Sequence, residues 1–580
     1  MNMRFWLLLF ISTSLAMQAV EITFPSASGV RNVREFGALG DGTTDDTTAI
    51  NRALEAAGLL YFPAGTYLVS DQLRPPERKG GAVSRRILQG ADRDTVVIRL
   101  RDHCDGFGDA TKPREVLRIS WGVAQAFRNS IRDLTIDVGA GNPGASGCGY
   151  FASNQGHLRS VTLRAGPGSG AVGLNLDLGD NGPLTISDVR ISGFGIGIST
   201  KYGSCFTLED IALGGIRALG IRSQHSTLFL RKLHYRGDGP FLRDASNSAT
   251  VLLDGDLATS AKGIPGIQQS GRILLRDVHQ TGFTALVAGK EGALDVAQVD
   301  EWHSLPSPAA FTGSTRSSLD LPVAETPLIP WDPPEQWASV VDYPPTTVDG
   351  KTDWGPAVQA AIDSGKSTVY FPLGKGPYPI RSDVVLRGAV RRMTGLEQSI
   401  SKVGDQDCRP LFTVADGTAD GTADAVIIEQ FDAMYSGISV RHQGKRRLIL
   451  SGMQFATVEK VVGSGDLFLY DTYVQTLRLA GGRCWSRGLN SEYSQAHSPD
   501  GIHVINDGGL FWMFGFKNEG DGTKVATIGG GKSELYAMVL SNKATPRRSE
   551  TSPVHDPRCA SHGVLVGRRL AQAALGQSRR

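Results

Sequence analysis

Hydrophobic positions in the first half of the chain repeat in a short unit, in which two polar positions separate one apolar residue from the next. The unit begins at Ile131, Leu158, Ile186, Leu208, Leu230 and Leu275, so successive starts are 27, 28, 22, 22 and 45 residues apart. Gly, Asn and Ser residues that favour turns lie between the units. A period near 22 residues with local apolar–polar alternation predicts short parallel strands stacked coil upon coil in a β-helix.

Two segments interrupt this pattern in the same way. Each has a Gly- and Asp-containing turn, an Ala-rich amphipathic stretch and a strand-like return, LLYFPAGTYLV in the first and VYFPLG in the second. We expect short helices at about 46–57 and 355–363, with Asp45, Asp46 and Asp353 as capping carboxylates rather than metal ligands. The duplicated opening predicts two tandem units.

Prolines mark the boundary between these units. Seven of them lie between Pro306 and Pro334, which is typical of a linker. The expected organisation is a signal peptide over 1–19, a first β-helix unit over 20–315, a Pro-rich linker over 316–340, a second β-helix unit over 341–545 and a basic tail over 546–580. The tail is expected to be solvated and weakly helical.

Composition agrees with this architecture and excludes some functions. The 71 glycines indicate many tight turns between strands. Sixty Lys and Arg residues against 58 Asp and Glu give a net charge of +2, which argues against nucleic acid or another polyanion as a partner held by bulk charge. The six cysteines are widely spaced without a Cys-x-x-Cys pair, which excludes a zinc ribbon and permits disulfides in an oxidising compartment.

The N-terminus predicts export. An apolar stretch from Phe5 to Leu15 follows one arginine and precedes small residues suited to cleavage after Ala16 or Ala19. This pattern predicts a secreted or periplasmic protein. No later segment is apolar over a length that would span a bilayer, so we expect no membrane span.

The sequence GGLFWMFGFKNEG, from Gly508 to Gly520, predicts a strand with two different faces. Alternation assigns Leu510, Trp512, Phe514 and Phe516 to the interior, and Phe511, Met513, Gly515, Lys517 and Glu519 to the outer face. The outer face would offer an apolar surface, a gap at the glycine, and then a cation and a carboxylate. We interpret it as a sugar subsite with Phe511, Met513 and Lys517 as substrate-binding residues.

The opening FGALGDGTTDDTTAINRALEAA…LYFPAGTYLV resembles that of the pectate-lyase-like, or rhamnogalacturonase/epimerase-like, right-handed β-helix superfamily. Two such openings in one chain are most similar to the family 55 glycoside hydrolases. The resemblance covers most of residues 30–540. It implies an all-β fold of two tandem right-handed parallel β-helices, pectin-lyase-like solenoids packed side by side, each opened by a short helix. The motif is specific for the fold and weak for activity.

The same resemblance implies catalytic residues. WMFGFKNEG resembles a Trp-x-Leu-Gly-aromatic-Lys-Thr-Glu segment of family 55, which assigns the general acid to Glu519. SRGLNSEYSQ resembles an Ala-Arg-Gln-Leu-Asn-x-Glu segment, which places Glu492 and Arg487 at the site. ASNQGHLRSVTL resembles a Gln-x-x-x-Leu-Arg-x-Val coil, which implies that Gln155 holds the attacking water. An internal polar ladder is the alternative interpretation of Gln155 and its neighbour Asn154.

Two positions depart from that family pattern. Asn518 stands where family 55 usually has threonine. Asp180 or Asn181 stands where a small hydroxyl residue is expected one coil after Gln155, and we expect both of them, like Arg487, to bind substrate. Either a carboxylate base replaces the hydroxyl there, or the substrate differs.

The first functional hypothesis is therefore an inverting glycoside hydrolase of exo-β-1,3-glucanase type. It would act on a polysaccharide as a monomer, without a metal or cofactor. The alternatives are a polysaccharide lyase and a non-catalytic glycan-binding protein. A lyase would need a calcium site, yet Asp416, Asp420 and Asp424 are not spaced as a calcium loop, and His497 and His503 are more typical of a surface.

Overall fold

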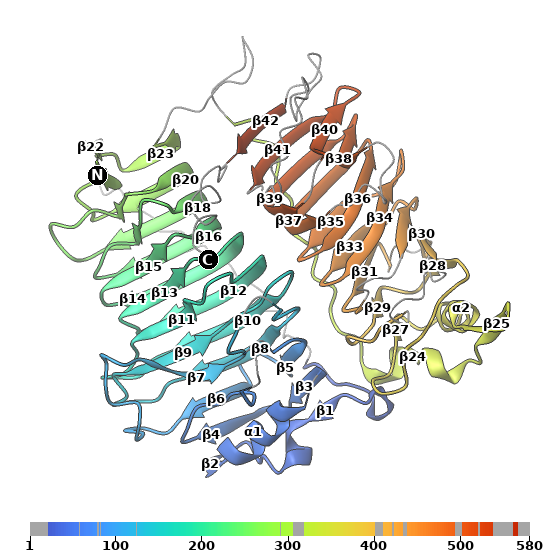
Figure 1. Ribbon diagram of the computed structural model, residues 1–580, viewed down its shortest axis with the longest axis horizontal. Helices are drawn as coiled ribbons and strands as arrows, with labels where there is room; N and C mark the ends of the chain where they lie inside the picture. Colours follow the sequence, from blue (N-terminus) through green and yellow to red (C-terminus); the bar gives the residue numbers. More distant parts are fainter. Residues whose placement is uncertain are drawn as a thin grey trace, which may run out of the picture.

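The computed structural model of the protein describes residues 21–56, 58–77, 81, 83–122, 125–290, 292–304, 318–400, 410–419, 421, 423–432, 438–492, 501–519, 522–537 and 561–565. Over these ranges the chain is nearly all β, in two stacks of parallel strands that stand side by side (Figure 1). No helix in these ranges is long and apolar enough to cross a membrane. The predicted signal peptide lies outside the described residues.

Two sheets run along the first β-helix. The larger sheet contains β1 (Arg31–Asn32), β2 (Asp41–Asp45), β3 (Gly58–Phe62), β4 (Gly65–Val69), β5 (Arg86–Gly90), β6 (Val96–Leu100), β8 (Ser130–Asp137), β10 (His157–Arg164), β12 (Leu184–Ser192), β14 (Phe206–Ile216), β16 (Thr227–Gly237), β18 (Ala249–Thr259), β20 (Arg272–Thr281) and β23 (Gln298–His303). The second sheet contains β7 (Arg114–Arg118), β9 (Ala145–Gly149), β11 (Val172–Leu176), β13 (Ile196–Lys201), β15 (Leu219–Gln224), β17 (Leu242–Asp244), β19 (Ile267–Gln268), β21 (Val287–Gly289) and β22 (Gly292–Leu294). Neighbouring strands pair in parallel until the stack ends, where β23 and β22 each pair antiparallel.

The register confirms the repeat predicted from the sequence. Its first apolar positions pair directly from coil to coil, as in Leu158 with Ile186 and then Leu208. The double interval of 45 residues contains an unrecognised unit in β18, where Gly255 replaces the second apolar residue.

A left-handed residue explains the spacing of this repeat. The second polar position of each unit has φ between 51° and 56°, at Asp133, Ser160, Asp188, Asp210, Lys232, Asp254 and Asp277. Strict alternation would put residues three apart on opposite faces of a strand. The left-handed residue shifts that phase by one position, so both apolar residues point into the core. Aspartate, which tolerates this conformation better than most residues, occupies five of the seven positions.

The second β-helix is one continuous set of paired strands. It contains β24 (Trp337–Ser339), β27 (Thr368–Tyr370), β28 (Val384–Gly388), β29 (Arg392–Thr394), β30 (Leu411–Gly417), β31 (Ala425–Glu429), β32 (Ser439–His442), β33 (Arg447–Ser451), β34 (Gln454–Lys460), β35 (Leu467–Tyr470), β36 (Tyr473–Ala480), β37 (Arg483–Glu492), β38 (Ile502–Asp507), β39 (Leu510–Glu519), β40 (Thr523–Ile528), β41 (Lys532–Ala537) and β42 (Ser561–Leu565). Most strands pair with the strand two positions along, so successive strands lie on alternate faces. A short hairpin of β25 (Thr346–Val348) and β26 (Lys351–Asp353) lies apart from it. Because β42 pairs with β41, this part of the tail is a strand rather than the weak helix expected.

The two predicted helices are confirmed. They are α1 (Thr47–Glu55) and α2 (Gly355–Asp363), and short 3-10 turns occur at η1 (Ser26–Ser28), η2 (Val33–Phe36), η3 (Pro334–Gln336) and η4 (Val340–Asp342). The predicted capping carboxylates bind backbone amides: Asp45 accepts from Thr47 N at 3.1 Å and Asp353 from Gly355 N at 2.9 Å. Asp46 instead accepts from the turn before the helix.

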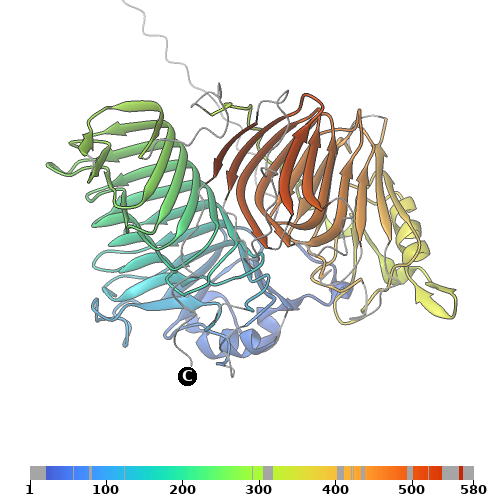
Figure 2. The same cartoon turned by 45° about the horizontal axis from the view of Figure 1, so that its top comes forward.

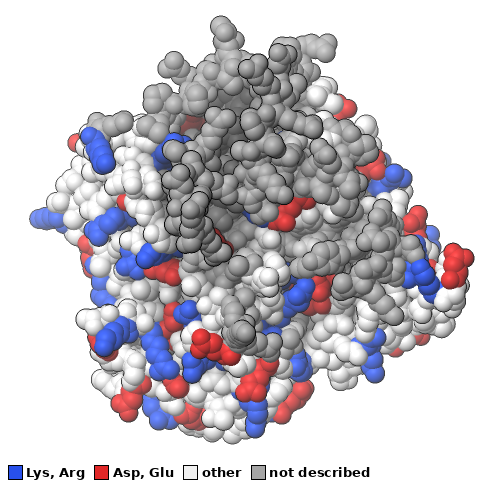
Figure 3. Space-filling view, in the orientation of Figure 1, with Lys and Arg blue, Asp and Glu red and all other residues white. Residues whose placement is uncertain are grey.

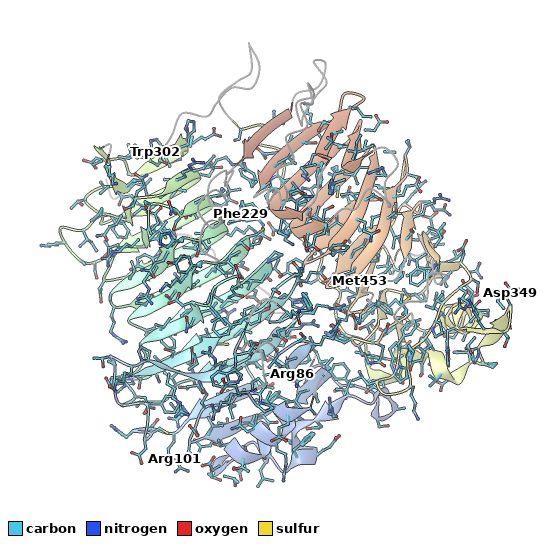
Figure 4. The ribbon with its side chains drawn as sticks, in the orientation of Figure 1. Arg86, Arg101, Phe229, Trp302, Asp349 and Met453 are labelled. Atoms are coloured by element: carbon cyan, nitrogen blue, oxygen red, sulfur yellow. The ribbon has the colours of Figure 1, made fainter. Side chains whose placement is uncertain are left out.

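Each β-helix has its own apolar interior, and a third apolar cluster contains residues of both. Figure 2 shows the two stacks side by side, as Figure 1 does. Figure 4 shows Phe229 at this boundary, on the side of the first β-helix. The described part of the linker joins the cluster through Leu321, and Pro322 accepts a hydrogen bond from Trp485 at 2.9 Å. The linker therefore packs against both units instead of only connecting them.

Charge and cysteine placement follow the composition. Acidic and basic side chains are interspersed over the described atoms visible in Figure 3, without one sign dominating. The four described cysteines, Cys104, Cys148, Cys205 and Cys484, are buried and free. Cys408 and Cys559 lie outside the described residues, so the described part of the chain contains no disulfide.

Candidate functional site at the junction of the two β-helices

Two glycines of the second unit lie directly against the first β-helix. A Cβ atom on Gly488 would lie 2.3 Å from Cγ2 of Thr185, and one on Gly515 would lie 1.9 Å from Oγ1 of Thr207. Both glycines are left-handed, with φ of +65° and +76°. No other residue satisfies both conditions without strain. These glycines hold the ends of β37 and β39 against β12 and β14.

Gly515 also changes which side chains of β39 face outward. The interior of the second β-helix contains Phe511, Met513 and Phe516, whereas Trp512 and Phe514 lie in the cluster between the units. Unbroken alternation would place Phe516 with Trp512 and Phe514, so the left-handed glycine shifts the phase by one residue. The prediction that Phe511 and Met513 form a sugar subsite is wrong, because both side chains are fully buried in that interior.

A polar cluster begins directly after the two glycines. Lys517 Nζ donates to Asn154 Oδ1 of the first β-helix at 3.1 Å and forms an ion pair with Glu492. Asn490 Nδ2 donates to Glu492 Oε1 at 3.1 Å and approaches Asn154 Oδ1 at 3.4 Å. The Lys517 side chain is 4% exposed and that of Glu492 is 28% exposed. The cluster thus includes both units, with Lys517 and Asn490 buried and with Glu492 and Asn154 partly exposed.

Glu519 is the register partner of Glu492 on the adjacent coil. Neighbouring strands lie about 4.8 Å apart, so two acidic residues follow one another at the same edge of the junction. The side chain of Glu519 lies outside the described part of the structure. Its neighbour Asn518 is fully buried and donates to Ser491 O at 2.7 Å, away from the cluster.

Gln155 faces the second β-helix but is not open to solvent. Its side chain is buried, and Nε2 donates to Met453 O and Asp471 O, each at 3.0 Å. Figure 4 shows Met453 on the side of the second unit that faces the first. Both amide hydrogens are therefore engaged across the junction. The amide oxygen is buried and has no hydrogen-bond partner among the described groups.

Asp471 is the centre of this buried contact. Its carboxylate accepts from Gly156 N at 3.1 Å and lies 3.2 Å from His157 Nδ1. Burial raises the pKa of Asp471 to about 7, although the Gly156 amide and the Arg128 charge oppose the shift. Burial also lowers the pKa of His157 well below its ordinary value, with Arg132 adding to the effect. Sequence reasoning missed Asp471 and His157, since neither belongs to a recognisable motif.

Arg487 and Asn181 support the structure instead of facing a substrate. Arg487 lies 2.6 Å from Glu209 of the first β-helix and is 2% exposed, with its guanidinium 5.2 Å from the centre of the Trp512 ring. Asn181 is fully buried, accepts from Ala152 N at 3.0 Å and donates to Tyr150 O at 3.1 Å, both on the preceding coil. The prediction that these two residues bind substrate is therefore wrong in both cases.

Asp180, by contrast, is exposed at the same corner of the first β-helix. Its amide donates to Tyr202 O of the next coil at 3.2 Å. Of the predicted substrate-binding residues, Asp180 is thus exposed, whereas Lys517 is buried and paired with the partly exposed Glu492. Asp180 and Lys517 belong to different β-helices.

Acidic residues of the 416–424 turn do not form a cation site in the described structure. Asp416 accepts from Lys445 N at 2.6 Å, and Asp424 pairs with Arg447. The described residues hold no group of three or more His, Cys, Asp or Glu side chains suited to a metal. Asp420 and His497 lie outside the described residues, and His503 is buried beside Ser491 and Asn518.

Comparison with known families gives a match within the first unit. Residues 30–234 match the family described as rhamnogalacturonase A/epimerase, pectate lyase-like. The match covers less than half of the chain, and the matched residues include Asn154, Gln155 and Asp180 of the junction.

Curated relatives match only parts of the chain. Mannuronan C5-epimerase AlgE5 of Azotobacter vinelandii is 36% identical over 141 residues, which are 23% of this chain and 14% of that protein. A probable glucan endo-1,3-beta-glucosidase of Arthroderma benhamiae is 24% identical over 338 residues, 51% of this chain and 37% of that protein. The chain thus spans about a seventh and about a third of these relatives. Among solved structures, the A-module of mannuronan C-5 epimerase AlgE6 of Azotobacter vinelandii has 13% identity and a TM-score of 0.27, covering 87% of this chain and 99% of that one.

Proposed function

We propose that the protein is a carbohydrate-active enzyme, an inverting glycoside hydrolase that cleaves β-1,3-glucan or a related polysaccharide, with Glu519 as general acid. The observation that supports this most directly is the register of Glu492 with Glu519 at the edge of the junction, beside Lys517. Most glycoside hydrolases use two carboxyl-bearing residues at the scissile bond. The family 55 resemblance of two tandem units supports the same assignment, as does the probable glucan endo-1,3-beta-glucosidase, whose likeness covers half of the chain.

The contacts of the cluster favour different roles for Glu492 and Glu519. Glu492 already accepts hydrogen bonds from Lys517 and Asn490, so it is less suited to giving a proton to a leaving group. Glu519, one coil further, is the better candidate for the acid. The attacking water would then come from the first β-helix, where Asn154 and Asp180 lie. Gln155, predicted to hold this water, is buried with both amide hydrogens engaged, so the structure contradicts that role. Inversion requires about 6.5–9.5 Å between acid and base, whereas a retaining pair is separated by about 5 Å, so Asp180 of the first β-helix, rather than Glu492 on the adjacent coil, would be the base.

The decisive experiment is hydrolysis of laminarin by Glu519→Gln. Glutamine keeps the volume of the side chain but has no proton to donate, so the rate should fall by about 10²- to 10⁴-fold. Glu492→Gln should reduce the rate less if its carboxylate mainly positions Lys517. Glu459→Gln, which removes an exposed carboxylate paired with Arg441, is the control and should act like wild type. Cleavage by Glu519→Gln at the wild-type rate would remove this residue from the mechanism.

Stereochemistry provides an independent check. Proton NMR identifies which anomer of the product the hydrolysis of laminarin releases first. Inversion is expected if a water attacks from the side of the first β-helix. Retention would mean that a carboxylate attacks the anomeric carbon, and Glu492, on the coil next to Glu519, would then be the nucleophile.

Action on a uronate polymer is the second candidate. It is favoured by the likeness to mannuronan C5-epimerases, of which AlgE5 and AlgE2 are each 36% identical over 141 residues. Incubation with alginate and polygalacturonate distinguishes the candidates, since a lyase releases ultraviolet-absorbing unsaturated products and an epimerase alters the uronate composition. A protein that binds glycan but changes none of these polymers would be non-catalytic. We further propose that it acts outside the cytoplasm after removal of residues 1–19, which N-terminal sequencing of the exported protein would check.

A further inference from the structure

Four successive turns of the first β-helix stack at the corner that precedes the larger sheet. Gly182 N donates to Ala152 O at 2.8 Å, Asp180 N to Tyr202 O at 3.2 Å, and Tyr202 N to Gln224 O at 2.8 Å. Each turn therefore lies one coil from the next, about 4.8 Å along the axis. The first of these turns carries Asn154, which contacts Lys517 and Asn490 of the candidate site. The corner continues away from that site.

An aromatic surface lies on this corner. The Tyr202 ring stacks on the His225 ring of the next coil, with centroids 4.9 Å apart and planes 6° apart. Lys201 lies 5.5 Å from the centre of the Tyr202 ring. Tyr202 is 52% exposed and is the one residue among the described Phe, Trp and Tyr that is classed as exposed. All other described aromatic rings of these types are buried or half-buried.

The backbone at this corner argues against a chance exposure. Asn154, Asp180, Tyr202 and His225 all have φ between 45° and 62°. Asparagine and aspartate adopt this left-handed conformation readily, but a tyrosine does so at a cost in stability. The ring gains little burial in return. A large exposed aromatic residue in a strained turn is therefore more consistent with ligand binding than with folding.

We propose that Tyr202 and His225 form a platform that binds a neutral β-linked polysaccharide chain and leads it toward the cluster of Asn154, Lys517 and Glu492. This inference rests on the proposed function for its direction, though the binding itself does not require hydrolysis. Tyr202 lies two coils from Asn154, about 10 Å along the axis, so a bound chain would extend beyond the cleavage point. The platform thus adds a second contact for a polymer that a short oligosaccharide could not reach.

The charges around the platform indicate a neutral ligand. Lys201 and Asp180 are both exposed beside Tyr202 and have opposite signs. A polyuronate would require several cations along its path, and this corner offers one cation opposed by one carboxylate. The flat apolar face of a glucopyranose ring, in contrast, can stack on tyrosine and histidine without any charge partner. We therefore expect laminarin to bind in preference to alginate.

Binding is best tested with the full chain carrying Glu519→Gln, so that turnover cannot consume the ligand. Affinity electrophoresis in gels containing laminarin should show about tenfold weaker binding for Tyr202→Ala, because about 60 Å² of apolar contact is lost. His225→Ala should weaken binding less, and Tyr202→Phe should bind normally because it keeps the ring. His234→Ala, an exposed histidine on the outer side of β16, is the matched control and should bind like the parent.

Tyr202→Gly separates binding from folding. Glycine relieves the left-handed strain, so this variant should be as stable as the parent or more stable, yet bind laminarin about tenfold more weakly. A residue with only a structural role would not give these opposite changes. Equal laminarin binding by the parent and Tyr202→Gly, or no laminarin binding by the parent, would overturn the platform. If the wild-type protein hydrolyses none of the polymers while laminarin binding is intact, only the proposed function would be overturned.

Discussion

Replacement of Gly515 by alanine tests whether the close approach of the two β-helices positions the site. The change adds one methyl group at the point where β39 contacts Thr207 of β14. Gly515 also sets the phase that directs Lys517 toward Asn154. The substitution should therefore reduce both stability and activity, although it alters no side chain of the polar cluster around Lys517 and Glu492.

Two costs add to the expected effect. A left-handed alanine costs about 1–2 kcal/mol relative to glycine. The new Cβ would lie 1.9 Å from Thr207 Oγ1 and 3.1 Å from its Cβ, so the β-helices must separate locally, which costs about 1–3 kcal/mol as overpacking. The total is about 2–5 kcal/mol. Gly481, with φ of +69° and nothing within 4 Å of an added Cβ, should show only the backbone part when replaced by alanine.

Urea unfolding followed by circular dichroism measures these differences. Gly515→Ala should lower the free energy of unfolding more than Gly481→Ala does. The double variant Thr207→Ala with Gly515→Ala should recover most of the steric part, because Oγ1 is removed, and should keep the backbone part. Equal losses for Gly515→Ala and Gly481→Ala would refute the argument that the contact with Thr207 holds the units in place. Unchanged laminarin hydrolysis in a destabilised Gly515→Ala protein would refute its link to the site.

Two further predictions concern buried charges at the junction. Burial raises the pKa of Asp471 from its ordinary 3.8 to about 7, so between pH 4 and 7 the folded protein retains a proton that the unfolded chain has lost. The contribution of this group to stability therefore falls as pH rises through that range. In urea unfolding, the free energy of unfolding of Asp471→Asn relative to that of wild type should be at least ~1 kcal/mol higher at pH 8 than at pH 4. A constant difference between the two proteins would contradict this. Glu209→Leu should cost about 3–5 kcal/mol in the same assay, because it leaves Arg487 and Arg231 buried with less compensation, while Asp466→Ala, which breaks the exposed pair with Arg483, should cost less than ~1 kcal/mol; similar losses in both variants would show that burial does not govern these pairs.

Local patterns predicted the fold because each coil repeats the same spacing of apolar residues and turns. The spacing of Leu158 and Val161 requires a phase shift within the strand, and a polar residue that tolerates a left-handed backbone supplies it at Ser160. The Ala-rich stretches similarly specified α1 and α2 within a few residues. Such features depend on residues that are neighbours in sequence. A single sequence is therefore enough to predict them.

The candidate site was predicted only in part. The register of Glu492 with Glu519 follows from the coil repeat, and the resemblance to family 55 pointed to both residues. The roles given to Phe511 and Met513 failed because alternation was extended through Gly515. Those given to Arg487 and Asn181 failed because Arg487 packs against the first unit and Asn181 is buried within its own unit. A glycine in a strand pattern signals a possible phase change, but its direction depends on what lies opposite.

The sequence by itself determined that the chain forms two β-helices of stacked coils with duplicated openings. Strand periods, turn residues and helix starts are properties of adjacent residues. The tertiary structure decided how the two stacks meet. Gln155 and Asp471 are 316 residues apart in sequence, and their contact forms because the two units pack together, with Gly488 and Gly515 allowing the backbones to approach Thr185 and Thr207. Packing between distant surfaces leaves no local period in a sequence. It is this packing that buried Asp471 and Lys517, left Glu492 partly open, and brought the candidate site together from two units.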